Sequence, residues 1–348
     1  MRVLQNVMLG TVLCVVGMSV LGVGGAAAAQ APAPVADRWS QLFAANNLDN
    51  EGKTPFHLRM TFQLYDLKGK AAETGTVEEW WAPGYSRRIV IKSPSLNEDE
   101  STVNEGNAAS VTRERYLVRE LLDEAVHPVP QHPPGPAEKL EEHKRYFGKV
   151  ELECETPASN AASTHHMSLP TLCIQPSTVY VRLLLNDSTA VERNTIGQFH
   201  DTYVALDVQE NLLGLSAISG KVTLLQGIDP AKSADELKPL TAAGASPERG
   251  KIAYMSGGVI AGARIKFVQP QYPEAAKVEH KSGVVLLHAL ISKEGLVKDL
   301  VPIAVSDPVF TDEAIDAVRH WVYSPYLLNG EPTEVDTTIT INFSMTHN

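Results

Sequence analysis

The cysteines and histidines are the side chains of this chain that could carry covalent or metal chemistry. Cys154 and Cys173 are the two cysteines that follow an apolar N-terminal segment, and an even number favours one disulfide in an exported chain. That bond would close a loop of about 20 residues and stabilise the fold by roughly 3 kcal/mol, whereas the alternative is two unpaired buried thiols. His165 and His166 lie between them, but adjacent histidines point apart and no Cys-x-x-Cys pair accompanies them. The sequence therefore predicts a disulfide and neither a metal site nor a cofactor.

No spacing of residues in the chain indicates an enzyme. The motifs Gly-x-Ser-x-Gly and His-Glu-x-x-His are absent, as is a glycine-rich loop that could hold phosphate. Three histidines flank a proline-rich stretch, where we expect solvent-exposed side chains rather than metal ligands: His127, His132 and His143. The net charge is -11 and no run of Lys or Arg could follow a phosphate backbone, which argues against nucleic acid and an anionic membrane as partners. We therefore expect a protein that is not an enzyme.

The N-terminus has the features of a signal peptide. Arg2 is the only charged residue among the first 36, and residues 7–21 are almost continuously apolar. Small residues follow, and we expect cleavage after Ala29, so that residues 1–29 direct export of the remaining chain. The alternative is an uncleaved anchor, because residues 7–29 are long enough to span a bilayer.

Residues 37–230 have the pattern of a β-rich domain. Apolar and polar side chains alternate from Phe56 to Leu64, which predicts a strand with one buried face. Apolar residues at helical spacing predict a helix over residues 113–126. Further strands are predicted over residues 74–81, 86–92, 149–154, 179–185, 203–209 and 221–226. The expected fold is an antiparallel β-meander or half-barrel with one or two helices laid on it.

The end of the chain predicts a second, smaller domain. Residues 231–258 are rich in Ala, Gly, Ser and Pro and are predicted to be a linker, as residues 30–36 are predicted to be a flexible leader. The domain that follows, residues 259–348, has a helix that begins near Thr311. Its strands are predicted over residues 283–291, 296–305 and 335–345. The sequence thus predicts an α/β sandwich of three antiparallel strands backed by one helix, and an α+β class for the whole chain.

Specific residues recur in a fixed order over the last quarter of the chain. They are Gln269-Pro270-Gln271-Tyr272-Pro273, Ala275-Ala276, Gly283-Val284-Val285-Leu286-Leu287, Gly295-Leu296-Val297, Ala314, Ala317, Trp321, Pro325, Gly330 and Ile341-Asn342-Phe343. Their order and spacing closely resemble the TonB C-terminal domain, a periplasmic module that grips outer-membrane transporters. The resemblance covers about residues 259–346.

This resemblance implies a periplasmic protein of the cell envelope, linked to TonB-dependent transmembrane transport. In the family, a short N-terminal peptide of the receptor adds as a strand beside the last strand of the module. The implied partner is an outer-membrane TonB-dependent receptor or another envelope protein, and a homodimer through the same sheet is the alternative. The implied partner-binding residues are Gln269, Tyr272, Thr338, Thr340, Asn342 and Ser344. For Gln269 the alternative is ordinary surface, and for Tyr272 it is packing in the core.

Two features distinguish the chain from a complete TonB energy transducer. Family anchors carry Ser-x-x-x-His, whereas Ser19 is followed four residues later by Val23. The predicted linker reaches at most ~100 Å when fully extended, and a released chain could transmit no force. We therefore expect a periplasmic interaction protein, with a membrane-anchored transducer that keeps its signal anchor as the alternative.

A second resemblance concerns the β-rich domain. The run Gly75-Thr76-Val77-Glu78-Glu79-Trp80-Trp81-Ala82-Pro83, followed by Arg87 and Arg88, resembles LolA-type open β-barrels, envelope proteins that carry acyl chains. This resemblance implies a second hypothesis, lipid or lipoprotein carriage. The concave face would then be lined by Phe56, Leu58, Met60, Phe62, Leu64 and Trp80. The alternative is that these side chains fill an ordinary core.

Overall fold

The computed structural model describes residues 35–84, 86–101, 112–130, 140–157, 170–186, 188–233, 236–237, 253–255, 264–328 and 331–345. The predicted signal peptide lies outside these residues, as do His132, His165 and His166. Within the described ranges, no helix combines the length and the apolar character that a membrane crossing needs.

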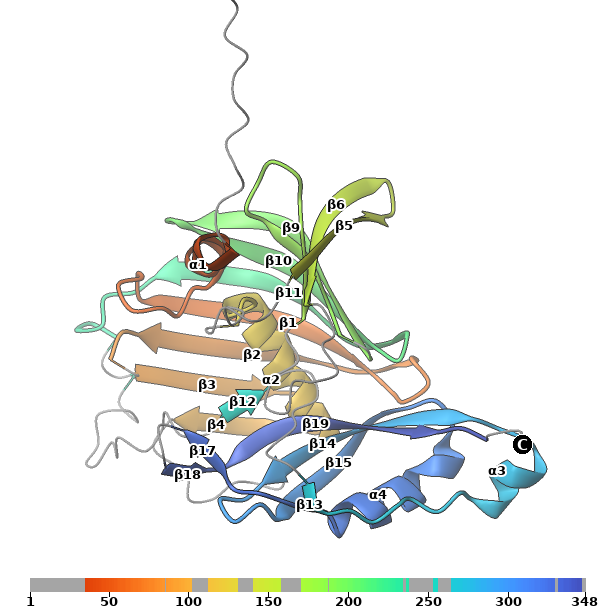
Figure 1. Cartoon of the computed structure of the whole chain (residues 1–348). Coiled ribbons are helices and arrows are strands. Elements are labelled where there is room, and N and C mark those ends of the chain that lie inside the picture. Colours follow the sequence, from red (N-terminus) through yellow and green to blue (C-terminus); the bar gives the residue numbers. More distant parts are fainter. Residues whose placement is uncertain are drawn as a thin grey trace, which may run out of the picture. The chain divides into compact units, whose positions relative to one another are not determined.

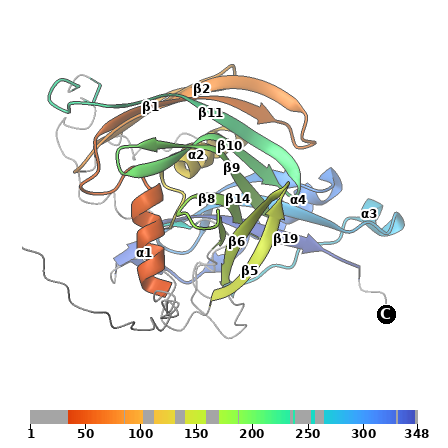
Figure 2. The ribbon, with the colours of Figure 1, turned by 90° about the horizontal axis from the view of Figure 1, so that it is seen from above.

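In the described part of the chain, eleven strands form one antiparallel sheet (Figure 1). The strand order is β4-β3-β2-β1-β11-β10-β9-β8-β7-β6-β5. Consecutive strands are therefore neighbours except β4 and β5, which form the two edges, and β1 also pairs with β11. The strands are β1 (Phe56–Tyr65), β2 (Ala71–Ala82), β3 (Ser86–Lys92), β4 (Asn97–Ser101), β5 (Leu140–Phe147), β6 (Val150–Pro157), β7 (Thr171–Ile174), β8 (Val181–Leu185), β9 (Thr189–Phe199), β10 (Thr202–Leu212) and β11 (Leu215–Gly227). The sheet curves around two helices, α1 (Val35–Asn46) and α2 (Arg113–Val126) (Figure 2). This arrangement confirms the predicted β-rich half-barrel with helices laid on it.

Helix α2 fills the concave face of this sheet. Thr112 caps it by accepting a hydrogen bond from the backbone N–H of Arg115, at 3.2 Å. Its apolar stripe packs into one cluster with the inward side chains of β1, which are buried: Phe56, Leu58, Met60, Phe62 and Leu64. The face on which an acyl chain would have to bind is therefore occupied by the protein's own helix α2.

Trp80 does not belong to that face, which corrects one prediction. Side chains alternate along β2, so Trp81 points into the core with Phe56 and Trp80 points to the other side of the sheet. There Trp80 stacks on the His57 ring at 4.2 Å, and the Arg88 guanidinium lies over it at 5.3 Å.

A second, four-stranded sheet is formed in the described part of the C-terminal region, in the order β12-β19-β14-β15. Its strands are β12 (Ala253–Met255), β14 (Gly283–Ile291), β15 (Val297–Val305) and β19 (Val335–Phe343), and helix α4 (Thr311–Arg319) covers one face. Strands β14, β15 and β19 with α4 confirm the predicted sandwich. Strand β12 is additional, and its residues fall within the stretch that the sequence analysis predicted to be a linker.

Shorter elements complete this region. They are α3 (Glu274–Val278), the 3-10 helix η3 (Pro308–Phe310) and the paired strands β13 (Arg264–Lys266) with β16 (Val322–Tyr323), and β17 (Tyr326–Leu328) with β18 (Glu331–Thr333). Helix α4 begins at Thr311, as predicted, and its N-cap residue, Phe310, makes no side-chain capping hydrogen bond. Asp307 accepts a hydrogen bond from the N–H of Val309 at 3.1 Å and so starts η3, which runs directly into α4.

Strand β15 forms the far edge of the four-stranded sheet. The register of β14 against β15 shifts between Leu286 and Leu287, where Leu287 faces Pro302. Gly295 makes the turn between the two strands at a φ of +83°. A Cβ at Gly295 would lie 1.8 Å from the Tyr323 carbonyl oxygen, so the close approach of backbone requires glycine there.

Candidate functional site

Three of the predicted partner-binding residues lie in β19, namely Thr338, Thr340 and Asn342, and Ser344 follows directly after it. On one side it pairs with β14 along its whole length, from Val335 with Ile291 to Phe343 with Gly283. On its other side, β12 pairs with the first three residues of β19. Among the described residues, no strand pairs with residues 339–343 on that side. We call residues 339–343 the open edge, because backbone groups along such an edge can pair with another extended chain.

The side chains of β19 alternate between a buried and an accessible face. On the accessible face, Thr340, Asn342 and Ser344 are exposed and Thr338 is half-buried. The opposite face packs in the core beneath α4 through Val335, Ile339, Ile341 and Phe343. The structure therefore brings the four polar positions that the sequence analysis selected to one side of the same strand.

A histidine and an aspartate join β14 to β19 on this accessible side, and the sequence analysis did not identify them. His288 Nε2 lies 2.6 Å from Asp336 Oδ1, and the imidazole is buried. Its ring lies 4.6 Å from that of Tyr116 in α2, and its Nδ1 has no hydrogen-bond partner among the described residues. A single histidine in an apolar strand gives no sequence pattern by which to find this pair. The His288–Asp336 pair lies at the beginning of β19, away from the open edge.

Tyr272 borders the end of the open edge as a packing residue. Its ring makes edge contacts with Phe310 at 5.7 Å and with Phe343 at 6.0 Å between ring centroids. Its hydroxyl donates a hydrogen bond to the Lys281 carbonyl. These contacts fix the proline-flanked segment against the end of β19, so that Tyr272 shapes the site from the side.

Gln269 is exposed, next to a segment that is anchored. Trp321 Nε1 donates to the carbonyl oxygen of Val268 at 2.7 Å, and the Arg264 guanidinium lies 4.6 Å above the Trp321 ring. The backbone before Gln269 is therefore held in place while its side chain faces solvent. The described contacts bring Tyr272, but not Gln269, to β19.

A buried charged cluster lies on the concave face of the large sheet, which the sequence analysis also missed. Arg87 Nε donates to Glu79 Oε1 at 2.5 Å, and Arg87 Nη2 donates to Asp123 Oδ1 at 2.8 Å. Burial raises the pKa of Glu79 to about 7, although Arg87 acts in the opposite direction. Glu79 Oε2 has no hydrogen-bond partner among the described residues. These ion pairs join β2, β3 and α2, so the role of the cluster is structural.

His127 extends this polar cluster at the end of α2. The sequence analysis predicted an exposed side chain, but His127 is half-buried and its Nδ1 lies 2.6 Å from Asp49 Oδ1. Burial alone would lower the pKa of His127, and the hydrogen bond and charge of Asp49 raise it overall. His143 is exposed. In the described residues, no group of three or more His, Cys, Asp or Glu side chains could hold a metal ion.

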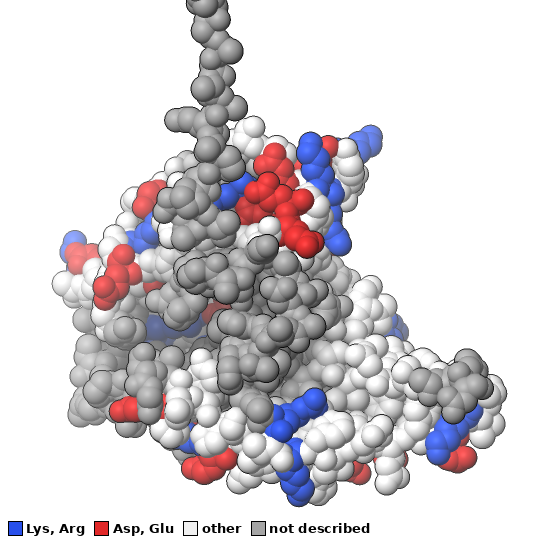
Figure 3. All heavy atoms as spheres, viewed as in Figure 1, with Lys and Arg blue, Asp and Glu red and all other residues white. Residues whose placement is uncertain are grey.

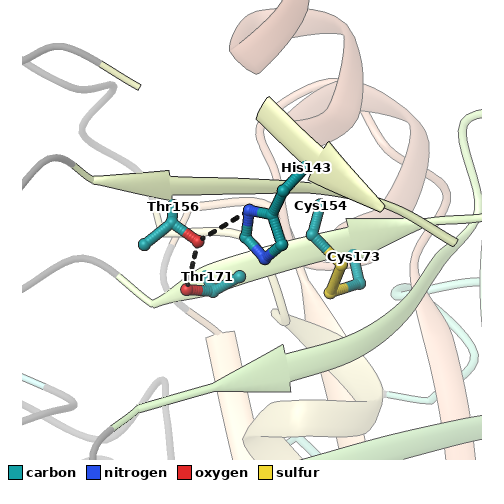
Figure 4. The surroundings of a disulfide bond; sticks show 5 residues. All are labelled: His143, Cys154, Thr156, Thr171 and Cys173. Atoms are coloured by element: carbon teal, nitrogen blue, oxygen red, sulfur yellow. Dashed lines mark hydrogen bonds between the residues drawn. A yellow bond between two sulfur atoms is a disulfide. The ribbon is translucent and has the colours of Figure 1, made fainter. Parts of the chain in front are cut away.

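Cys154 and Cys173 form a disulfide between β6 and β7 (Figure 4). They are register partners in the sheet, and both are buried with Leu152 and Leu183. Figure 4 also shows the His143 ring between the disulfide and Thr156, whose hydroxyl lies 2.9 Å from that of Thr171. The bond therefore fastens two adjacent strands near the sheet margin.

Charge on the described surface is mixed. On the face drawn in Figure 3, Lys and Arg side chains and Asp and Glu side chains gather in small separate groups. On the β5–β6 hairpin, Lys144 Nζ lies 2.6 Å from Glu151 Oε1. Such short exposed pairs add little to stability and do not form a surface that could follow a phosphate backbone.

The C-terminal geometry defines a class of module: three antiparallel strands, covered by a helix on one face, with an open edge on the last strand. Residues 268–345 match the family described as Gram-negative bacterial TonB protein C-terminal. This stretch at the end of the chain is thus similar to the C-terminal domain of TonB proteins. A comparison with curated proteins found no match.

Solved structures similar to the chain include a TonB C-terminal domain and a LolA superfamily protein. The TonB C-terminal domain of Pseudomonas aeruginosa is 19% identical, covers 27% of this chain and 95% of its own, and has a TM-score of 0.24. A domain described as an outer membrane lipoprotein-sorting protein from Vibrio parahaemolyticus is 10% identical, with coverages of 59% and 97% and a TM-score of 0.33. A LolA superfamily protein from Nitrosomonas europaea is 6% identical, with coverages of 57% and 96% and a TM-score of 0.29. Scores this low carry no conclusion about function.

Proposed function

We propose that this chain is a periplasmic binding protein that captures an extended segment of a partner by adding it as a strand to β19. The observation that carries the proposal is the open edge. Residues 339–343 pair with β14 on one side and with no described strand on the other. Since each added backbone hydrogen bond contributes about 0.5–1.5 kcal/mol net, five residues of edge can support a specific but reversible complex.

The side chains around this edge would select the partner. Thr340, Asn342 and Ser344 are short, polar and exposed, so they can bond to the backbone or to polar side chains of an added strand. Thr338 lies on the same side of β19, nearer to its beginning, and Tyr272 closes the end of the strand. Gln269 is proposed as a contact from the anchored segment beside Trp321.

The partner class that fits best is the N-terminal segment of an outer-membrane TonB-dependent receptor. The family match supports this choice, because the domain found over residues 268–345 is the C-terminal domain of TonB proteins. The function would then be linked to transmembrane transport, with export directed by residues 1–29. A second copy of the chain could compete for the same edge, and separate titrations with receptor peptides and with the chain itself distinguish the two partners.

A second function, carriage of lipid on the half-barrel, has weaker support. The five apolar side chains of β1 that would line the cargo site pack against α2 and are buried. Carriage would require α2 to leave that face, with the loss of its buried apolar contacts and of the Arg87–Asp123 ion pair.

Backbone NMR on the isotope-labelled full chain tests the proposed function. Peptides from the N-termini of TonB-dependent receptors are titrated, and we expect amide shifts concentrated in residues 339–343. A titration of the unlabelled full chain into the labelled chain tests the homodimer. Shifts with the second copy alone would contradict receptor capture, and an unchanged β19 in both titrations would contradict strand addition altogether.

A further inference from the structure

We propose that β12 is a resident strand, which occupies part of the partner-binding edge of β19 and must be displaced for a partner to pair along the whole strand. This inference rests on the proposed function and concerns its regulation. It assigns a role to a segment that the composition of the chain marks only as a linker.

The pairing of β12 provides the geometric evidence. Ala253, Tyr254 and Met255 pair in parallel with Val335, Asp336 and Thr337. All other strand pairs of this sheet are antiparallel. Strand β12 therefore does not continue the antiparallel pairing of this sheet. It is an extended segment from an earlier part of the chain, and it pairs with the side of β19 that β14 leaves free. It ends opposite Thr337, so the residues that it covers, Thr338 and the open edge together make one continuous edge of nine residues.

The length of the ladder makes β12 displaceable. A three-residue parallel ladder holds only a few backbone hydrogen bonds, each contributing about 0.5–1.5 kcal/mol net, and parallel pairs are slightly weaker than antiparallel ones. A partner that pairs with the full length of β19 would make up to about three times as many bonds. The partner therefore replaces the ladder of β12 and gains the pairing along residues 339–343.

The chain connection keeps β12 close to its site. Eight residues join β12 to β13, and β13 is itself paired with β16. A connection of this length gives a tethered segment an effective concentration in the millimolar range. A weak intramolecular strand can then stay bound without a partner and still yield to one. Capture would be reduced, rather than blocked, by the resident strand.

A peptide with the sequence of residues 250–258 of this chain tests the inference without knowledge of the partner. The site is opened by the double substitution Ala253→Pro and Tyr254→Pro, which removes adjacent N–H groups and so breaks the ladder in either hydrogen-bonding register. The matched control is Ala253→Ser with Tyr254→Phe, which keeps both N–H groups. Amide resonances of β19 in the full-length labelled chain report occupancy.

We expect the proline variant to shift the amides of residues 335–337 and the added peptide to restore them. The peptide should bind the wild type and the control at least about tenfold more weakly, because their own strand competes. Equal binding of the peptide to all three proteins, or unchanged amides in the proline variant, would overturn the inference.

Receptor peptides in the same assay separate this inference from the proposed function. If the chain's own peptide restores the amide resonances of residues 335–337 and no receptor peptide binds, the resident strand is established and receptor capture is refuted. Receptor peptides that bind the wild type and the proline variant equally well leave capture established and refute the competition by β12.

Discussion

Tyr254 and Asp336 are register partners in a parallel ladder, although they lie at opposite ends of the C-terminal region. The pairing divides β19 into a covered beginning and an open end. His288, which bonds to Asp336 from β14, holds the covered beginning from the other side. The open end is bordered by Tyr272 and faces solvent through Thr340 and Asn342. In the function proposed above, the open end is the place for a partner and β12 is its competitor.

Removal of the disulfide should destabilise the protein by about 3 kcal/mol, because Cys154 and Cys173 close a loop with a sequence separation of 19. The double variant Cys154→Ala with Cys173→Ala is compared with the wild type by urea unfolding. Reduced wild type serves as the control and should match the double variant. A loss below about 1 kcal/mol would show that the bond is not a main source of stability.

Gly75→Ala should cost at least about 2 kcal/mol of unfolding free energy, since overpacking of a closed site forces backbone shifts. A Cβ at this position would lie 2.3 Å from Phe62 Cζ and 2.5 Å from the Lys92 carbonyl oxygen. Gly227→Ala is the matched control at the end of β11, where the nearest atom to a new Cβ is 3.6 Å away. Thermal unfolding of both variants checks the difference, and equal losses would contradict the tight contact.

Glu210→Gln should change how stability depends on pH. Burial, together with the charge of Glu124, raises the pKa of Glu210 from 4.5 to about 8, although Arg113 opposes the shift. A raised folded-state pKa means that the protonated form is favoured on folding. The stabilisation is therefore present in full below about pH 4.5 and is lost as the pH rises towards 8.

Urea unfolding from pH 5 to pH 8 measures this effect. The wild type should lose stability across that range, and Glu210→Gln should remove a part on the order of 3 kcal/mol of that loss, since the glutamine stays neutral. Glu274→Gln, at an exposed position on α3, is the surface control. Parallel pH profiles for the wild type and Glu210→Gln would contradict the account.

The elements with strict periodicity were predictable from the sequence. The helix over residues 113–126 and the strand from Phe56 follow their predicted patterns because each buries one apolar face. The alternation in β19 likewise placed Thr340 and Asn342 on the accessible side. In each case the side-chain period determines which face is buried, whatever the neighbouring elements are.

The remaining features depend on contacts between distant segments. Strand β12 has three residues and no apolar alternation long enough to predict a strand. Glu79, Arg87 and Asp123 come from different elements, so their ion pairs follow only from the folded arrangement. Trp80 was assigned to the wrong face because two adjacent tryptophans leave the phase of the alternation open.

Disulfide trapping at Asn342 tests the capture of an extended chain most directly. Asn342→Cys is mixed with receptor N-terminal peptides that carry a cysteine at one end, and Lys298→Cys on β15 is the control at the opposite edge of the sheet. We predict a disulfide at position 342 with peptides that carry the cysteine at one of their two ends, and no selective disulfide at position 298. Equal trapping at both edges, or none at position 342, would contradict the account.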